Sequence, residues 1–180
     1  MKIAIINGKG GVGKTTVSLL LAAALRKSGA SASLEDRDPQ QTATAICPAL
    51  EIPLSGGQIV VIDTAPRLDH APTLSAFRDA DKIILVTTPS PADLASTAAT
   101  ARVLQQERGR KPGVIILFNN VQHNRFEAIM ASTAAALPFS LAAVHIRRRA
   151  CYQAALVEGW AALSGEAREE IQQAALAIIT

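Results

Sequence analysis

A glycine-rich segment near the start of the chain has residue types and spacing suited to holding phosphate. Residues 8–15 read Gly-Lys-Gly-Gly-Val-Gly-Lys-Thr, a complete match to G-x-x-x-x-G-K-[ST]. Glycines let consecutive backbone N–H groups turn toward phosphate oxygens, and the start of a following helix adds partial positive charge. In such a loop Lys14 would bridge the β- and γ-phosphates, and the Thr15 hydroxyl would ligate Mg²⁺. The segment therefore predicts a nucleotide-binding phosphate loop.

The elements expected around this loop are those of an α/β protein. Continuous apolar runs, typical of strands buried on both faces, alternate with helix-like runs along the chain. Strands are predicted at Lys2–Asn7, Ser31–Asp36, Gln58–Asp63, Lys82–Thr87 and Val114–Phe118. Helices are predicted at Thr15–Ser28 (closed by Gly29), Thr73–Asp79, Ala92–Glu107, Phe126–Ala136, Ala150–Glu158 and Glu166–Ile179. The alternation predicts a doubly wound, mostly parallel sheet with helices on both faces, which binds ligands beyond the carboxyl ends of its strands.

Length and composition limit the class of protein. The chain has 180 residues and 49% hydrophobic content, which fits one domain with a sizeable core. Its longest uncharged apolar run, residues 17–25, is well short of the roughly 20 residues that a membrane span needs. The two cysteines, Cys47 and Cys151, form no metal-binding spacing. We expect a soluble, cytoplasmic single domain over residues 1–180, without a helix-turn-helix domain before the first strand.

The loop carries a second lysine, Lys9, that a simple phosphate loop does not need. Residues 9–16, Lys-Gly-Gly-Val-Gly-Lys-Thr-Thr, resemble the deviant Walker A motif of the ParA/MinD ATPases. The resemblance implies that Lys9 crosses an ATP-bridged homodimer interface and contacts the partner's nucleotide. A cation supplied in this way would neutralise charge on the transferring phosphoryl group. The residues then implied in ATP binding are Gly10, Gly11, Val12, Gly13, Lys14, Thr15 and Thr16.

Two acidic segments extend the resemblance. Residues 36–40, Asp-Arg-Asp-Pro-Gln, resemble the family's switch I, and residues 59–66 resemble its Walker B strand and switch II. The resemblance implies that Asp38 orients or deprotonates the attacking water and that Asp36 supports the Mg²⁺ site. Asp63, at the end of its strand, would hold a water on Mg²⁺. The structural alternatives are an Asx turn for Asp38 and a strand or turn cap for Asp63.

The similarity continues along most of the chain. Residues 87–94 resemble the Thr-Pro-Ser-Pro-x-Asp stretch of small, ParF-like partition ATPases, and residues 146–152 resemble the segment before their penultimate helix. Asn119 matches a position where MinD relatives place Asn against the adenine ring, although it could equally cap a turn. Two departures stand out. The segment 42–58, between switch I and the Walker B strand, is shorter than in most family members, which suggests that a strand or helix is trimmed there. The second strand, Ser31–Asp36, is more polar than the family's, which suggests a position at the sheet edge or poor order.

Positive charge is concentrated in one stretch of the chain. The net charge is +3, but residues 101–149 hold eight basic and two acidic side chains. Arg147, Arg148 and Arg149 could bind DNA phosphates in a sequence-independent, salt-sensitive way, and an ATP-dependent dimer would double those contacts. The alternative is that these arginines pair with acidic residues of the last helix, namely Glu166, Glu169 and Glu170.

The resemblance implies an ATPase that requires ATP and Mg²⁺, has weak basal activity and is stimulated by a ParB-like or cargo-adaptor protein. Its role would be to segregate plasmid or chromosomal DNA, or to position a cargo, on the nucleoid. A MinD-like membrane cycle needs a basic amphipathic tail, whereas residues 166–180 are net acidic, so no membrane partner is expected. Metal-cluster-maturation relatives use cysteines near the switch regions, which Cys47 and Cys151 do not supply.

Overall fold

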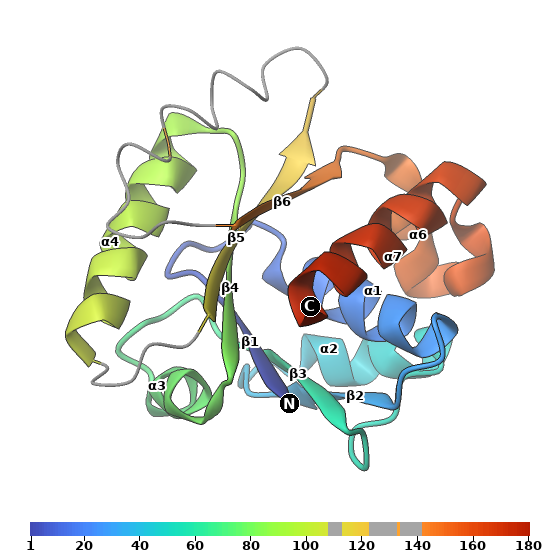
Figure 1. The fold of residues 1–180 in the computed structure, drawn as a ribbon, viewed down its shortest axis with the longest axis horizontal. Helices are drawn as coiled ribbons and strands as arrows, with labels where there is room; N and C mark the ends of the chain where they lie inside the picture. Colours follow the sequence, from blue (N-terminus) through green and yellow to red (C-terminus); the bar gives the residue numbers. More distant parts are fainter. Residues whose placement is uncertain (108–112, 123–132, 134–141) are drawn as a thin grey trace.

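A parallel sheet forms the centre of the computed structural model, which describes residues 1–107, 113–122, 133 and 142–180 (Figure 1). In the described residues the sheet has six strands: β1 (Lys2–Ile6), β2 (Ala32–Asp36), β3 (Ile59–Asp63), β4 (Lys82–Thr87), β5 (Gly113–Val121) and β6 (Ala142–Arg147). Their order is β2-β3-β1-β4-β5-β6, and every neighbouring pair is parallel. The predicted doubly wound α/β fold is confirmed. The chain changes direction across the sheet at β1, so the loop after β1 lies where ligands bind in such folds.

Helices cover both faces of the sheet (Figure 1). One face packs against α1 (Lys14–Lys27), α2 (Thr42–Ile46), α6 (Ala150–Glu158) and α7 (Gly165–Ile179), together with the 3₁₀ turns η1 (Cys47–Leu50) and η2 (Trp160–Ala162). The other face packs against α3 (Ala71–Asp79) and α4 (Pro91–Glu107). The phosphate loop thus joins the most central part of the sheet to a helix on its first face.

The continuous apolar runs are explained by burial on both faces. In β1, Ile3 and Ile5 pack in the core beside α1, whereas Ala4 and Ile6 pack in the core beside α3 and α4. Side chains alternate between the faces of a strand, so a strand covered on both sides has no position that favours a polar residue. The more polar β2 lies at the sheet edge, as its composition suggested.

Two parts of the chain differ from the sequence expectation. β6 was not predicted, because its sequence Ala-Ala-Val-His-Ile-Arg is rich in small residues and ends in positive charge. It pairs with β5, which extends to Val121 rather than ending at Phe118. The short segment 42–58 holds α2 and η1, and the helix predicted over residues 126–136 lies outside the described residues.

Helix α1 ends as predicted, at a glycine. Gly29 has a φ of +88°, and its N–H donates to the carbonyl of Arg26 while the Ala30 N–H donates to the carbonyl of Leu25. These two bonds form a Schellman cap, for which glycine is the favoured residue. None of the helices in the described residues is long and apolar enough to cross a membrane.

Candidate nucleotide-binding site

A cavity of about 710 Å³ opens at the carboxyl ends of the strands. One wall is the phosphate loop with the start of α1, a second includes the loops after β2 and β3, and a third is formed by the ends of β5 and β6 with the start of α6. The volume is in the usual range for a small-molecule site. Predicted site residues in its lining are Gly10, Gly11, Gly13, Lys14, Thr15, Thr16, Asp38, Asn119, Arg148 and Arg149.

The phosphate loop depends on glycine at its tightest point. Gly13 has a φ of +94°, a left-handed conformation that side chains disfavour. A Cβ at this position would also lie 2.1 Å from Asn119 Nδ2. Asn119 itself is buried and donates from Nδ2 to the carbonyl of Val12 at 2.9 Å. Asn119 therefore braces the loop from β5, and its contact with adenine stays a prediction.

Lys14 extends across the loop rather than into solvent. It is buried, and its Nζ donates to the carbonyl of Lys9 at 3.2 Å. Burial lowers the pKa of Lys14, while the negative charges of Asp63 and Asp38 act in the opposite direction. A buried ammonium group with little hydration gains strongly from an added anion. The position suits Lys14 to bind phosphate.

Asp63 is a fully buried carboxylate at the end of β3. Its Oδ2 accepts from the Thr15 hydroxyl at 2.8 Å, and its Oδ1 accepts from the Ser18 hydroxyl at 2.8 Å. Burial raises the pKa of Asp63 to about 6 in spite of these hydrogen bonds. A hydroxyl and a carboxylate at the phosphate loop are the hard oxygen donors that Mg²⁺ prefers, so these residues fit the expected ion. Ser18 was not predicted, although it lies one helical turn from Thr15 on the same face of α1.

The raised pKa of Asp63 has a consequence for stability. A carboxyl whose pKa is higher in the folded state is bound to a proton more strongly there, so the free energy of unfolding falls as the pH rises from about 4 through about 6 and stays lower above that range. Asp63→Asn removes this cost. We expect the nucleotide-free variant to be more stable than the parent at pH 8 by about 2–3 kcal/mol, or about 5 °C or more in Tm.

Thermal melts of the parent and Asp63→Asn at pH 8 and pH 4.5 test this expectation. The difference in Tm should shrink at pH 4.5, where the parent's buried carboxyl is protonated. Asp69→Asn is the control, because the Asp69 side chain is 72% exposed and should leave Tm unchanged. The explanation fails if the Tm difference is the same at both pH values.

Asp36 supports the loop that carries Asp38. Its Oδ1 accepts from the Asp38 N–H at 3.0 Å, and its Oδ2 accepts from the N–H and the hydroxyl of Thr44 at 2.9 and 3.2 Å. The carboxylate therefore ties the start of α2 to the end of β2. Its predicted support of Mg²⁺ stays a prediction. Thr44 was not predicted, because nothing in the sequence indicates that a residue of the short helix α2 contacts Asp36, eight positions earlier in the chain.

Asp38 lies in the cavity wall with one oxygen in an Asx turn, since its Oδ1 accepts from the Gln40 N–H at 3.0 Å. The adjacent Arg37 fixes the loop from outside the cavity. Its guanidinium pairs with Glu35 at 2.7 Å and with Asp79 of α3 at 2.9 Å. The loop that presents Asp38 is thus held from β2, α2 and α3.

Lys9 is exposed on the phosphate loop, as a residue that reaches a second copy must be. Its backbone N–H donates to Asn7 Oδ1 at 2.9 Å. Asn7 is fully buried and donates from Nδ2 to the carbonyl of Val86 at 2.7 Å and to the Thr97 hydroxyl at 2.9 Å. Asn7 therefore connects the loop to β4 and α4. The only sequence signal for it is an amide at the end of an otherwise apolar strand.

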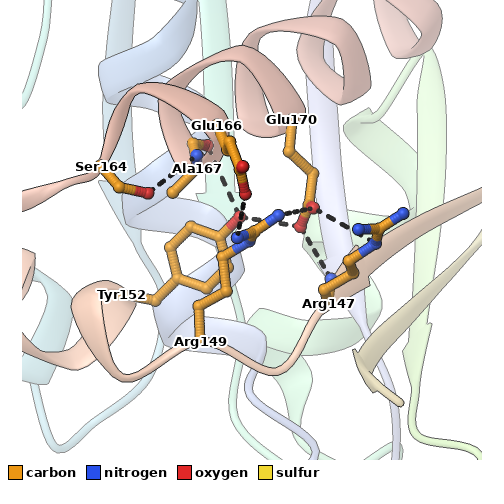
Figure 2. Close-up of polar contacts among 7 residues, drawn as sticks. All are labelled: Arg147, Arg149, Tyr152, Ser164, Glu166, Ala167 and Glu170. Carbon is orange, nitrogen blue, oxygen red and sulfur yellow. Dashed lines mark hydrogen bonds and ion pairs between the residues drawn. The ribbon is translucent and has the colours of Figure 1, made fainter. Parts of the chain in front are cut away.

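The three consecutive arginines have different surroundings, and Figure 2 shows two of them, Arg147 and Arg149, beside α7. Arg149 pairs with Glu166 at 3.1 Å and with Glu170 at 3.0 Å. For Arg149 the structure thus shows the alternative to DNA binding, which is pairing with acidic residues of the last helix. The Arg147 N–H donates to Glu170 at 2.7 Å, while its guanidinium is 3.9 Å from the same carboxylate and 45% exposed. Arg148 is exposed at the cavity rim.

The fold and the loop geometry define a P-loop nucleotide-binding protein. A sequence model of the CobQ/CobB/MinD/ParA nucleotide binding domain matches residues 3–159, and the chain belongs to this family. At the level of the family it is an ATPase of the ParA/MinD type.

Individual relatives agree with this assignment. Maintenance of carboxysome distribution protein A of Halothiobacillus neapolitanus is 29% identical over 182 residues, covering 87% of this chain and 84% of that protein. The solved structure of apo McdA from Cyanothece has a TM-score of 0.78 at 17% identity and covers 99% of both chains. MinD of Pyrococcus horikoshii OT3 complexed with Mg-ADP has a TM-score of 0.69 at 18% identity, covering 98% of this chain and 93% of that one. The two structures share the fold.

Proposed function

We propose that the chain dimerises around Mg-ATP, binds DNA without sequence preference in that form, and hydrolyses ATP when a partner protein stimulates it. The observation that carries this proposal is the grouping of Lys14 and Thr15 in the cavity wall, within a complete phosphate loop, with the buried Asp63 directly behind them and hydrogen-bonded to the Thr15 hydroxyl. Lys14 supplies one cationic group and Asp63 one acidic group, both poorly solvated without ligand, and such a combination is suited to bind a phosphate–magnesium pair.

Each group has a distinct task in this proposal. The N–H groups of the loop and Lys14 bind the triphosphate, and the Thr15 hydroxyl with Asp63 would hold Mg²⁺. When bound, the ion neutralises charge on the β- and γ-phosphates. Asp38 orients the attacking water or accepts its proton, and Lys9 supplies positive charge to the site of the second copy.

The cycle is proposed to position a cargo on DNA. The relative from Halothiobacillus neapolitanus carries the name maintenance of carboxysome distribution protein A, which supports cargo positioning over plasmid or chromosome segregation. The partner would be a ParB-like or cargo-adaptor protein that binds the ATP dimer and completes its hydrolytic site.

Of the three consecutive arginines, we propose that Arg147 and Arg148 contact DNA. Arg149 is engaged by two carboxylates, so its guanidinium is less suited to bind phosphate. Arg148 and the half-exposed guanidinium of Arg147 remain as the proposed contacts. In a dimer they would supply four arginines, enough to make the affinity steeply dependent on salt.

The test is binding of random-sequence duplex DNA with ATP, ADP or no nucleotide at two salt concentrations. We expect tight, salt-sensitive binding with ATP alone. The double variant Arg147→Ala/Arg148→Ala should lose about tenfold or more in affinity and show a smaller salt slope, since each phosphate contact contributes about −0.9 to that slope. The variant retains Arg149 and the backbone bond of residue 147 to Glu170.

Arg26→Ala is the matched control, because Arg26 is exposed near the end of α1, roughly 18 Å along the helix from Lys14. It should bind DNA as the parent does. ATP affinity is measured for every variant. Unchanged DNA binding by the double variant would place the DNA site elsewhere, and no DNA binding by an ATP-bound parent dimer would contradict the DNA proposal itself.

A further inference from the structure

We infer that Glu170 of α7 is a positioning residue for the nucleoside end of the cavity: its carboxylate fixes Arg149 and Tyr152, which line that wall, together with the backbone at the end of β6. The inference rests on the proposed binding of ATP. Neither the family match nor the motif accounts for Glu170, which lies outside the cavity and outside the matched residues.

Glu170 accepts hydrogen bonds from three directions (Figure 2). Its Oε1 accepts from the Tyr152 hydroxyl at 2.8 Å and from the Arg147 N–H at 2.7 Å. Its Oε2 accepts from Arg149 Nη2 at 3.0 Å. One carboxylate thus joins the end of β6, the loop that follows and the first turn of α6.

The cluster of Glu170, Arg149 and Tyr152 is largely buried, so the loss of one of its contacts is not readily compensated by water. The Glu170 side chain is 14% exposed, the Arg149 side chain 19%, and Tyr152 as a whole 4%. Burial and the hydrogen bond to Glu170 raise the pKa of Tyr152, which keeps the phenol a proton donor to the carboxylate. A charged pair in partly desolvated surroundings is costly to break from one side, because the remaining charge loses its partner. Glu166, the other partner of Arg149, is 82% exposed and compensates little.

The cluster lies at the wall of the cavity where the nucleoside, rather than the triphosphate, of a bound ATP would lie. The phosphate loop forms one wall of the cavity, and Arg148, Arg149, Tyr152 and Gln153 contribute to another. With the triphosphate at the loop, the nucleoside must extend along the rest of the cavity. A residue that holds only this second wall should therefore affect binding of the nucleoside and leave binding of the triphosphate unchanged.

Two ligands separate these effects: Mg-ATP, and Mg²⁺ with inorganic tripolyphosphate, which lacks the nucleoside. Glu170→Gln keeps the size of the side chain but removes the charge and places an amide N–H₂ toward one of the donors. We expect its Kd for Mg-ATP to rise about tenfold, while its Kd for Mg-tripolyphosphate stays within about twofold of the parent's. Tyr152→Phe, which removes one donor and keeps the ring, should show the same pattern to a smaller extent.

Glu169→Gln is the control, because Glu169 is an exposed neighbour on α7 whose carboxylate accepts from Gln173 instead. Both of its dissociation constants should match the parent's. Equal losses for both ligands in Glu170→Gln and Tyr152→Phe would show a general structural role and overturn the inference, as would unchanged ATP binding in both. A parent that binds tripolyphosphate but gains nothing from the nucleoside would instead contradict the proposed ATP specificity.

Discussion

Lys14→Ala is expected to weaken Mg-ATP binding by about 100-fold or more. Lys14 is buried in the loop, and its Nζ is 3.2 Å from the carbonyl of Lys9, so the ammonium group is already positioned and largely desolvated before ligand arrives. Hydrogen bonds to a charged partner contribute about 1.5–3 kcal/mol each, and a lysine that bridges two phosphates makes more than one. Equilibrium binding of a fluorescent ATP analogue measures the loss.

The comparison for Lys14→Ala is Lys27→Ala, at the other end of the same helix. Lys27 is partly exposed and pairs with Glu51, an ion pair of the kind that contributes little to stability. Melts without nucleotide establish that both variants fold. If Lys14→Ala bound Mg-ATP within threefold of the parent, the proposed phosphate contact of Lys14 would be wrong.

The phosphate loop was predictable because its information is local. Eight consecutive residues specify the turn, and the tightest distant contact that its glycines accommodate is Asn119 against Gly13. Asp63 was predictable for a similar reason, as a carboxylate that ends an apolar strand. Sequence spacing thus located the groups that we propose to contact the ligand, although it did not show which residues hold them in place.

The supporting residues could not be predicted, because their partners are far away in the sequence. Asn7 bonds to residues 79 and 90 positions later. Thr44 returns to Asp36 only because α2 begins as a short helix beside β2. Such contacts depend on the tertiary fold, and a single sequence with polar residues at loop positions gives no distance information.

The arginine cluster shows how charge counting falls short. Eight basic residues in one stretch favour a DNA surface, and the alternative is that the arginines pair with Glu166, Glu169 and Glu170 of the last helix. In the structure Glu166 and Glu170 pair with Arg149, whereas Glu169 accepts from Gln173. Glu166 and Glu170 are four residues apart on α7, so they lie on one helix face and can hold one guanidinium between them. That spacing favours the pairing of Arg149 with both carboxylates. Deciding between DNA binding and this pairing, however, required knowing where α7 lies relative to β6.

Asp38→Ala is expected to keep Mg-ATP affinity within a few-fold of the parent's and to reduce hydrolysis by about 10²–10⁴-fold. Asp38 lies in the cavity wall, where its negative charge favours the protonated form of Lys14 without a hydrogen bond to it in the described contacts. Removing Asp38 therefore leaves the phosphate contacts in place. Because hydrolysis ends the ATP-bound state, the variant should accumulate as an ATP dimer that dissociates slowly after a chase with ADP.

Asp38→Asn separates the carboxylate's chemistry from its structural bond. Asp38 Oδ1 accepts from the Gln40 N–H, and an asparagine can keep this Asx turn while it loses the charge that orients or deprotonates water. Equal loss of hydrolysis in the Ala and Asn variants would assign the effect to the carboxylate. Recovery in Asp38→Asn would assign it to the loop, whose other supports from Asp36 and Arg37 are unchanged. An Asp38→Ala dimer that dissociates as fast as the parent's would remove Asp38 from the hydrolytic step, since trapping requires that hydrolysis be what releases the dimer.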